Sequence, residues 1–456
     1  MNGFRFALVA AALFLVAGAD DHRPSKAPSP EQKGKAFEWK TQGGLPFEYI
    51  IPESYDPKVG ANLVVVLHGN GLDYRWTFWN HPPGEFRPDD VVVSLEGPTF
   101  LQSTNAFEFL AGHDECAKVH AALEELKKTF KVKQTFLYGH SQGSFFVFEY
   151  AGEFPDDVDG VVGHAGALWM SSKLGKFGHR QAIAFLHGTD DANVPWHQSV
   201  SGRKAYRDAD YPNVHLRTLW DWPHAPVWEQ AQGELAWCEG MTSSDPARIA
   251  SALATLLAVK DPPNLNVKLG LDPAAIFAVA ARLESFTYET PAQKSAATKA
   301  KTLVDKVAKS IAADLDASLA KGKLTKVDGK PWLGMATRFL EDFDGVAACA
   351  AWAKAHDAEL SAIDKTAESA GREFWQNADK EPAKALPAGL ELLEKGWRNA
   401  GIREVATRLR DWSTKEKELK LPKKEAARIT ALVDAFERGR KEGFEAYEKR
   451  LRELSP

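Results

Sequence analysis

A serine flanked by glycines is the clearest sign of chemistry in this sequence. It lies in the segment GHSQG, residues 139–143, which follows the apolar run 135–138 and precedes a stretch with helical character. A serine on a sharp turn between a strand and a helix needs glycine on both sides, because a Cβ there would collide with the neighbouring backbone. Such a turn exposes the hydroxyl, so Ser141 is the predicted nucleophile.

The carboxylate that such a serine requires is predicted in the segment HGTDDANVP, residues 187–195. This segment follows an apolar run and is expected to form a loop at the end of a strand. A carboxylate there can hold an imidazole in the correct tautomer from the side opposite the serine. We predict Asp191 for this role. Asp190, which is also suited to capping a turn, and Asp221 are the alternatives.

The general base is predicted in the segment DWPHAP, residues 221–226, directly after the last apolar run. Of the 13 histidines, His224 alone follows the final predicted strand and opens a loop that leads to a helix. His215 lies within that strand, and His164 and His197 come earlier. The sequence therefore predicts a hydroxyl, an imidazole and a carboxylate in one hydrogen-bonded row.

Two backbone N–H groups are predicted to stabilise negative charge on a reacting carbonyl oxygen. The segment LHGNG, residues 67–71, ends the first clear strand and enters a loop that can present the N–H of Asn70. The N–H of Gln142 follows the nucleophile. Preorganised donors of this kind typically lower a barrier by about 3 kcal/mol each. His68 is interpreted as a structural loop residue.

Aromatic side chains cluster around these segments. Trp76 and Trp79 follow the 67–71 loop, His140 precedes the serine, and Trp222 flanks the predicted base. Large flat rings suit phenolic, sugar or polyester groups, which makes these four residues candidates for a substrate pocket. The alternative is that the tryptophans fill the hydrophobic core.

The elements that must position these groups are short strands covered by helices. Runs that are apolar on both faces and rich in β-branched residues are typical of a parallel sheet buried on each side. An apolar stripe at helical spacing in 116–130 predicts a helix before the serine strand. The sequence thus predicts an α/β fold with a mostly parallel sheet, whose strands are 63–67, 91–95, 135–138, 158–162, 182–186 and 214–219.

The chain divides into four predicted regions. Residues 1–19 contain Arg5, an apolar stretch and small residues at the end, as in a signal peptide, so we expect export to the periplasm or the extracellular space. Residues 20–40 are predicted to be a flexible leader, and 41–260 the catalytic domain. Residues 263–456, rich in Ala, Lys, Glu and Leu, are predicted to form an all-helical domain of unknown role.

Capping signals mark several helix ends in this last region. Asp272 and Thr290 each precede a proline and are predicted N-caps, while Gly322 and Gly401 are predicted helix ends.

Composition excludes several classes of protein. A hydrophobic fraction of 44% with 26% charged residues is that of a globular protein, and a net charge of −5 lacks the basic excess of a nucleic-acid binder. No run beyond the N-terminal one reaches membrane-spanning length, so no stable membrane insertion is expected after cleavage of the signal peptide. The odd set of cysteines, Cys116, Cys238 and Cys349, leaves open one disulfide and one free thiol.

The four segments at 67–71, 139–143, 187–195 and 223–226 together resemble the α/β-hydrolase superfamily, and within it the carboxylesterase, polyhydroxybutyrate depolymerase and feruloyl esterase-like groups. The resemblance covers about residues 47–257. It implies an exported serine esterase that cleaves small-molecule or polymeric esters through an acyl-enzyme and needs no metal or organic cofactor. The family often has glycine before its catalytic histidine, where this chain has Pro223.

Two other functions are compatible with the same residues. One is a serine peptidase with the same fold and triad. The other is a catalytically inactive module that binds a partner or the cell envelope, in which the helical region does the work. The sequence leaves the oligomeric state open.

Overall fold

The protein is described by a computed structural model that covers residues 32–80, 85–174, 180–261, 270–286, 290–320, 322–415, 417–419, 421 and 423–454. The predicted signal peptide and the first part of the predicted leader lie outside these residues. None of the described helices is both long and apolar enough to span a bilayer.

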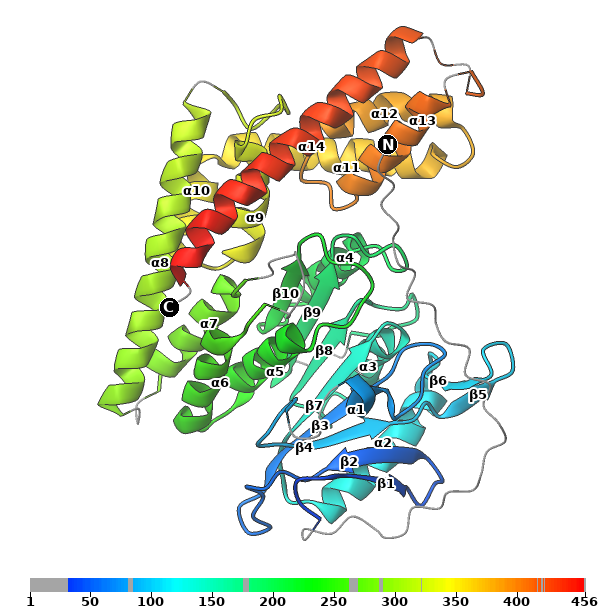
Figure 1. Cartoon of the computed structure of the whole chain (residues 1–456), viewed down its shortest axis with the longest axis vertical. Helices are drawn as coiled ribbons and strands as arrows, with labels where there is room; N and C mark the ends of the chain where they lie inside the picture. Colours follow the sequence, from blue (N-terminus) through cyan, green and yellow to red (C-terminus); the bar gives the residue numbers. More distant parts are fainter. Residues whose placement is uncertain are drawn as a thin grey trace, which may run out of the picture.

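A sheet of eight strands forms the centre of the first half of the chain (Figure 1). Six strands run parallel, and the first two pair antiparallel at one edge. Each of the six predicted runs falls on one of the parallel strands, which confirms the α/β class. In spatial order the strands are β1 (Ala36–Lys40), β2 (Pro46–Ile50), β4 (Val91–Leu95), β3 (Ala61–Leu67), β7 (Val132–His140), β8 (Gly160–His164), β9 (Ala182–Gly188) and β10 (Val214–Leu219).

Strand β1 corrects the predicted leader, which had been placed at 20–40. Ala36–Lys40 pairs with β2 and belongs to the sheet. The strand lies at the edge, and its Phe37 and Trp39 are only partly buried. Because an edge strand covers one face at most, it has no continuous apolar run from which it could be predicted.

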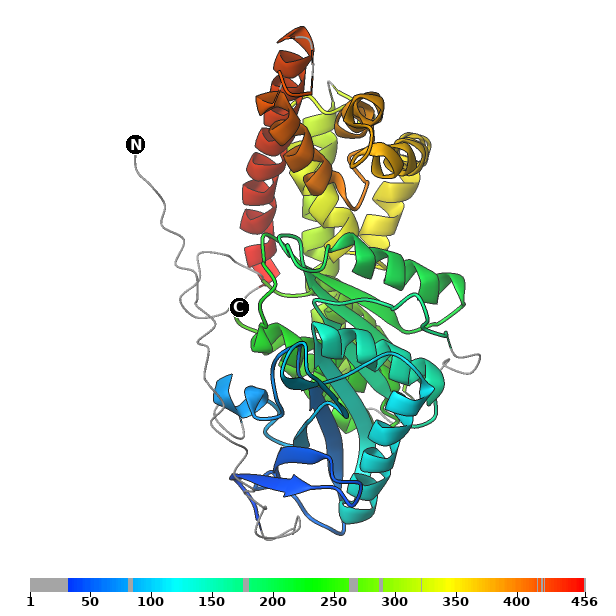
Figure 2. The same ribbon diagram turned by 90° about the vertical axis from the view of Figure 1, so that its right-hand side faces the viewer.

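Helices cover both faces of the sheet (Figure 2). The buried side chains of α2 (His113–Thr129) and α3 (Gln142–Glu153) share one apolar cluster with Tyr206 of α4 (His197–Asp208). The opposite face carries α1 (Trp76–Asn80), α5 (Trp228–Thr242) and α6 (Pro246–Ala258). The stripe predicted in 116–130 is the buried face of α2.

The second half of the described chain is helical, as predicted. Asp272 and Thr290 are the N-caps of α7 and α8, and each side chain accepts a backbone N–H. The prediction for Gly401 was wrong, because this residue precedes α13 and does not end a helix. The helices are α7 (Pro273–Glu284), α8 (Pro291–Leu319), α9 (Trp332–Asp342), α10 (Ala347–Ala355), α11 (Asp357–Asn377), α12 (Pro382–Lys395), α13 (Ile402–Thr414) and α14 (Lys423–Leu451).

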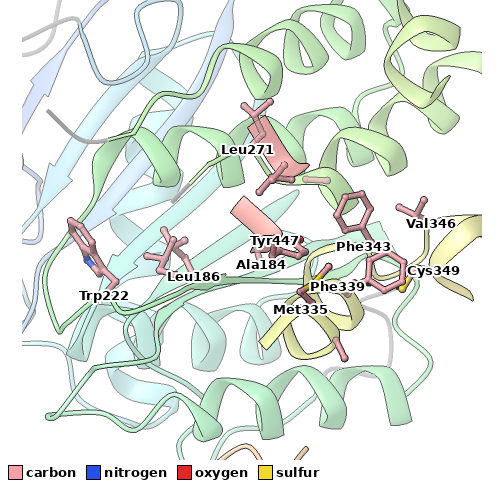
Figure 3. Close-up of a cluster of buried hydrophobic side chains, with 14 of the residues drawn as sticks. Ala184, Leu186, Trp222, Leu271, Met335, Phe339, Phe343, Val346, Cys349 and Tyr447 are labelled. Atoms are coloured by element: carbon pink, nitrogen blue, oxygen red, sulfur yellow. Dashed lines mark hydrogen bonds between the residues drawn. The ribbon is translucent and has the colours of Figure 1, made fainter. Parts of the chain in front are cut away.

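Sheet and helices share one buried apolar core. A single cluster includes Leu186 of β9 and Trp222 beside the sheet, and continues to Phe339 of α9 and Tyr447 of α14 (Figure 3). Helix α7 packs against α5 and α6 and thereby links the two halves. Among the described residues, this cluster includes side chains on both sides of the predicted boundary near 263, which itself lies outside the described residues.

The three cysteines do not pair. Cys116, Cys238 and Cys349 are free and buried in α2, α5 and α10. The disulfide that the sequence left open is therefore absent.

A buried charged group joins the last strand to the helical half. The imidazole of His215 in β10 donates to Asp272 at 2.7 Å, and Glu234 of α5 lies 3.7 Å from the same nitrogen. Burial disfavours the imidazolium, but the two carboxylates outweigh burial and raise the pKa of His215. Burial, reinforced by Asp272, raises the pKa of Glu234 to about 8. Arg217 lies 3.9 Å from Asp272.

These raised pKa values predict a fold that weakens as pH rises. The folded chain holds the Glu234 proton up to about pH 8, whereas an unfolded chain releases it near 4.5. The free energy of unfolding should fall over this interval. We expect the Tm of Glu234→Gln to fall less between pH 5 and 8 than that of the unmodified protein, measured by calorimetry. Glu229→Gln, on the same helix, is the control, and equal pH dependence in all three proteins would contradict the prediction.

Candidate active site

Ser141 stands on a strained turn between β7 and α3. Its backbone has φ 54° and ψ −118°, a conformation that few non-glycine residues adopt. Glycines make the turn feasible. A Cβ on Gly139 would lie 2.1 Å from the carbonyl oxygen of Gly143, and one on Gly143 would lie 2.5 Å from that of Leu67. The turn is fixed by the Ser141 N–H, which donates to the His164 carbonyl at 2.9 Å.

Three residues from distant segments form a hydrogen-bonded row. The Ser141 hydroxyl lies 3.0 Å from Nε2 of His224, and Nδ1 of the same ring lies 2.7 Å from Oδ2 of Asp191. With the proton on Nδ1, the ring donates to the carboxylate and accepts from the hydroxyl. This is the arrangement that a serine nucleophile needs for activation.

The carboxylate of Asp191 is buried and fully hydrogen-bonded. Its Oδ1 accepts the N–H groups of Asn193 and Val194 at 2.9 and 2.8 Å, and its Oδ2 also lies 3.1 Å from Nε2 of His187. Burial alone would raise the pKa of Asp191, but these bonds and that of His224 hold it well below its usual range. Asp191 therefore remains ionised beside the imidazole.

The alternative acids lie elsewhere. Asp190 forms an ion pair with Arg403 of α13. Asp221 lies 3.4 Å from the guanidinium groups of both Arg403 and Arg440. Among the described contacts of His224, Asp191 is the carboxylate partner.

The loop that carries His224 is held in place without a glycine before the histidine. The indole N–H of Trp222 donates to the Ala225 carbonyl at 2.7 Å, across the histidine. A Cβ on Gly188 at the end of β9 would lie 2.1 Å from the Trp222 carbonyl oxygen, so the loop lies directly against this strand. Pro223 is thus compatible with the position of the imidazole.

Two further histidines follow His224 into the interior: His140, which the sequence had suggested for a pocket, and His164, which had no assigned role. The ring of His140 lies 5.1 Å from those of His224 and His164, and burial lowers the pKa of His140 to about 3. Burial also lowers the pKa of His164 well below its ordinary value, and its Nδ1 is 2.9 Å from the Tyr138 hydroxyl. The signal was present in the sequence, because both histidines end neighbouring parallel strands and are paired in register.

The predicted donors of Asn70 and Gln142 flank the serine. The 67–71 loop approaches closely, since a Cβ on Gly69 would lie 3.1 Å from Cβ of Ser141. Within the described part of the chain, neither the Asn70 N–H nor the Gln142 N–H donates to a protein acceptor. Both N–H groups are therefore available to a ligand oxygen.

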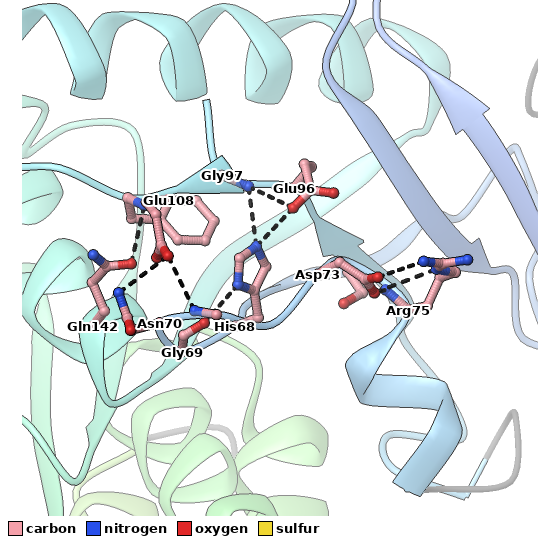
Figure 4. Close-up of polar contacts among 12 residues, drawn as sticks. His68, Gly69, Asn70, Asp73, Arg75, Glu96, Gly97, Glu108 and Gln142 are labelled. Atoms are coloured by element: carbon pink, nitrogen blue, oxygen red, sulfur yellow. Dashed lines mark hydrogen bonds and ion pairs between the residues drawn. The ribbon is translucent and has the colours of Figure 1, made fainter. Parts of the chain in front are cut away.

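A buried glutamate that sequence reasoning missed, Glu108, bonds to the loop that carries Asn70. Glu108 ends the hairpin of β5 (Thr99–Leu101) and β6 (Ala106–Glu108), and its Oε1 accepts from the side chain of Asn70 and the N–H of Gly71, both at 3.1 Å (Figure 4). The next N–H, from Phe109, donates to the side chain of Gln142 at 3.3 Å. One hairpin end thus contacts both predicted donor residues.

His68 has the structural role that was expected. Its Nδ1 donates to the Gly69 carbonyl at 2.9 Å, and its Nε2 lies 2.9 Å from Glu96 and 3.1 Å from the Gly97 N–H (Figure 4). The ring thereby ties the loop after β3 to the loop after β4.

The predicted pocket residues are mostly part of the interior. Trp76 stacks on His140 with ring centres 5.5 Å apart, and both are buried, as is Trp222. Trp76 and Trp222 belong to the apolar cluster that continues into the helical half, and the ring of His140 lies between those of Trp76 and His224, with centres 5.5 and 5.1 Å away. The side chain of Trp79 lies outside the described residues.

Two groups of described side chains have the spacing of metal ligands, and neither includes Ser141, His224 or Asp191. One is His215, Glu234 and Asp272, and the other is His120, Glu124 and Asp157. Each already has a basic partner, since Arg217 lies near Asp272 and Lys127 pairs with Asp157.

One protein family and several solved structures are similar to part of this chain. Residues 97–248 match the family described as alpha/beta hydrolase fold. No curated protein sequence matches the chain. Similar solved structures include a carboxylesterase from Mesorhizobium loti, with 12% identity over 44% of this chain and 99% of that one and a TM-score of 0.37. The Bacillus cereus carboxylesterase has 15% identity over 43% of this chain and 94% of that one, with a TM-score of 0.36. Est1E from Butyrivibrio proteoclasticus has 15% identity over 44% of this chain and 95% of that one, with a TM-score of 0.32.

The family match covers the serine turn, the acid and the histidine, and it includes the parallel strands β7, β8, β9 and β10. Over these residues the chain is similar to the alpha/beta hydrolase family, as the four motifs predicted.

Proposed function

We propose that this protein hydrolyses carboxylic esters through an acyl-enzyme on Ser141. The observation that carries the proposal is the row from the Ser141 hydroxyl through His224 to the ionised Asp191, with distances of 3.0 and 2.7 Å. The ester class is inferred from the resemblance of the four motifs to esterases. Nucleophile, base and donors are all protein groups, so the proposed reaction requires no added cofactor.

The first half of the proposed reaction forms the acyl-enzyme. As the Ser141 oxygen attacks the ester carbonyl carbon, its proton passes to Nε2 of His224. The resulting imidazolium is stabilised by Asp191, and the N–H groups of Asn70 and Gln142 receive the negative oxygen. His224 then returns the proton to the departing alkoxide, and the acyl group remains on Ser141.

The second half repeats these steps with water. His224 takes a proton from water, the hydroxide attacks the acyl carbonyl, and the collapse of the intermediate releases the carboxylic acid and restores the Ser141 hydroxyl. His140, whose pKa is about 3, stays neutral throughout. A neutral neighbour does not oppose the positive charge that develops on His224.

A fluorophosphonate probe tests the proposed nucleophile. The probe reacts with activated serines, so we expect it to label the purified protein and to leave Ser141→Ala unlabelled. Hydrolysis of p-nitrophenyl acetate and butyrate should be lost in the same variant. Labelling accompanied by cleavage of a peptide amide panel and not of the esters would favour the peptidase alternative. No Ser141-dependent labelling would leave the non-catalytic module as the remaining function.

The roles of the acid and the base are tested separately. Asp191→Asn removes the charge that stabilises the imidazolium, and we expect kcat to fall by about 10⁴-fold, with a similar loss in His224→Ala. Circular dichroism should show that both variants stay folded. Asp208→Asn, an exposed residue on α4 paired with Lys204, is the control. Unreduced turnover in either active-site variant would reassign that role.

We also propose that the protein is exported. The support is the apolar stretch 6–16 after Arg5, followed by Ala17 and Ala19, which fit a cleavage site before Asp20. N-terminal sequencing of the protein from its native host should begin at Asp20, and fractionation should find the protein outside the cytoplasm. A mature chain that retains residues 1–19 would contradict the proposal.

A further inference from the structure

The helical half contacts the two loops that carry Asp191 and His224, called here the acid loop (residues 189–195) and the base loop (residues 220–226). Arg403 of α13 contacts both loops. Its Nη1 donates to the Thr189 hydroxyl at 3.0 Å and lies 3.4 Å from Asp221, and the same group pairs with Asp190. A single guanidinium therefore binds both loops.

The two loops are also bonded directly at the point where Arg403 reaches them. The N–H of Asp221 donates to the Thr189 hydroxyl at 2.8 Å, and the N–H of Asp190 donates to the Trp222 carbonyl at 3.0 Å. The Thr189 hydroxyl thus accepts from the base loop and from Arg403 together. Asp221 has a positive φ of 59°, a backbone conformation that is uncommon for residues with a side chain but more frequent for aspartate.

The charges in this region favour such an arrangement. Asp190 and Asp191 are neighbours in the acid loop and Asp221 lies in the base loop, so three carboxylates occur on two loops that are bonded to each other, and like charges in a partly buried region repel. Arg403 forms ion pairs with Asp190 and Asp221, and Arg440 of α14 lies 3.4 Å from Asp221. Because Asp190 and Asp221 are paired with arginines, Asp191 is the carboxylate that bonds to His224.

We propose that Arg403 is a positioning residue for the triad. From the helical half, Arg403 fixes the position of the acid loop relative to the base loop. The hydrogen bonds from Asp191 to His224 and from His224 to Ser141 are thereby maintained. This inference rests on the proposed function, and it gives the helical half a part in catalysis. Arg403 touches neither the serine nor the imidazole and acts only through the loops.

Docking of the helical half does not depend on this arginine. Trp220 at the start of the base loop packs against Phe444 of α14 with ring centres 5.0 Å apart, and its indole N–H donates to Asp342 of α9 at 3.2 Å. Arg203 of α4 pairs with Glu341 at 3.1 Å. The apolar core adds to these contacts. Removing the Arg403 guanidinium should therefore disturb the loops and leave the halves joined.

The test compares Arg403→Met with Arg410→Met in the purified full chain. Arg410 lies on the same helix and pairs with Asp434 of α14, away from the loops. We expect Arg403→Met to lower kcat for p-nitrophenyl butyrate by about 10- to 100-fold with KM unchanged, because small misplacements of catalytic groups have effects of this size. Arg403→Lys should recover part of the loss, and Arg410→Met should match the unmodified protein.

Titration with the fluorophosphonate probe separates positioning from folding. A purely structural role would reduce the number of labelled sites and leave kcat per labelled site unchanged, and that result would overturn the proposal. Normal kcat in Arg403→Met would overturn it as well. If the unmodified protein itself shows no Ser141-dependent turnover, the failure belongs to the proposed function.

A second pair of variants keeps the proposal testable if Arg403→Met does not fold. Thr189→Val retains the shape of the side chain but removes the oxygen that joins Arg403 to Asp221, whereas Thr189→Ser retains the oxygen. We expect kcat to fall in Thr189→Val and to remain close to normal in Thr189→Ser. Equal kcat in the two variants would overturn the proposal.

Discussion

The backbone conformation of Ser141 is the constraint on which the rest of the site depends. A positive φ at a residue with a side chain is unfavourable, and it persists only where the surroundings hold it. Here Gly143 leaves room for the end of β3, Gly139 leaves room for the first residues of α3, and the His164 carbonyl receives the serine N–H. The same closeness brings the 67–71 loop beside the serine. The strained turn and the surrounding donors are therefore parts of one arrangement.

The central strands could be predicted because each is buried on both faces. A strand such as Ala61–Leu67 is then apolar at nearly every position, which is visible in the sequence without knowledge of its neighbours. Ala36–Lys40 could not be predicted in the same way, since its edge position leaves Glu38 and Lys40 acceptable and hides the pattern. Gly401 was misinterpreted because glycine is common at both helix ends, and only the following residues decide which end it marks.

The residues of the row could be predicted because each follows a strand within a recognisable local segment. Glu108 belongs to no such segment, since its importance lies in side-chain contacts with a loop distant in sequence. The choice between Asp190 and Asp191 was open for a similar reason. It depends on Arg403, which belongs to the helical half and carries no mark in the sequence that connects it with the acid loop.

The shared core also bears on how this chain tolerates shortening. Leu186 beneath the acid loop and Phe339 of α9 belong to the same buried cluster, and α7 covers apolar surface of α5 and α6. A fragment that stops after α6 would expose that surface to water and become prone to aggregation. The α/β half therefore relies on α7 to keep this apolar surface buried.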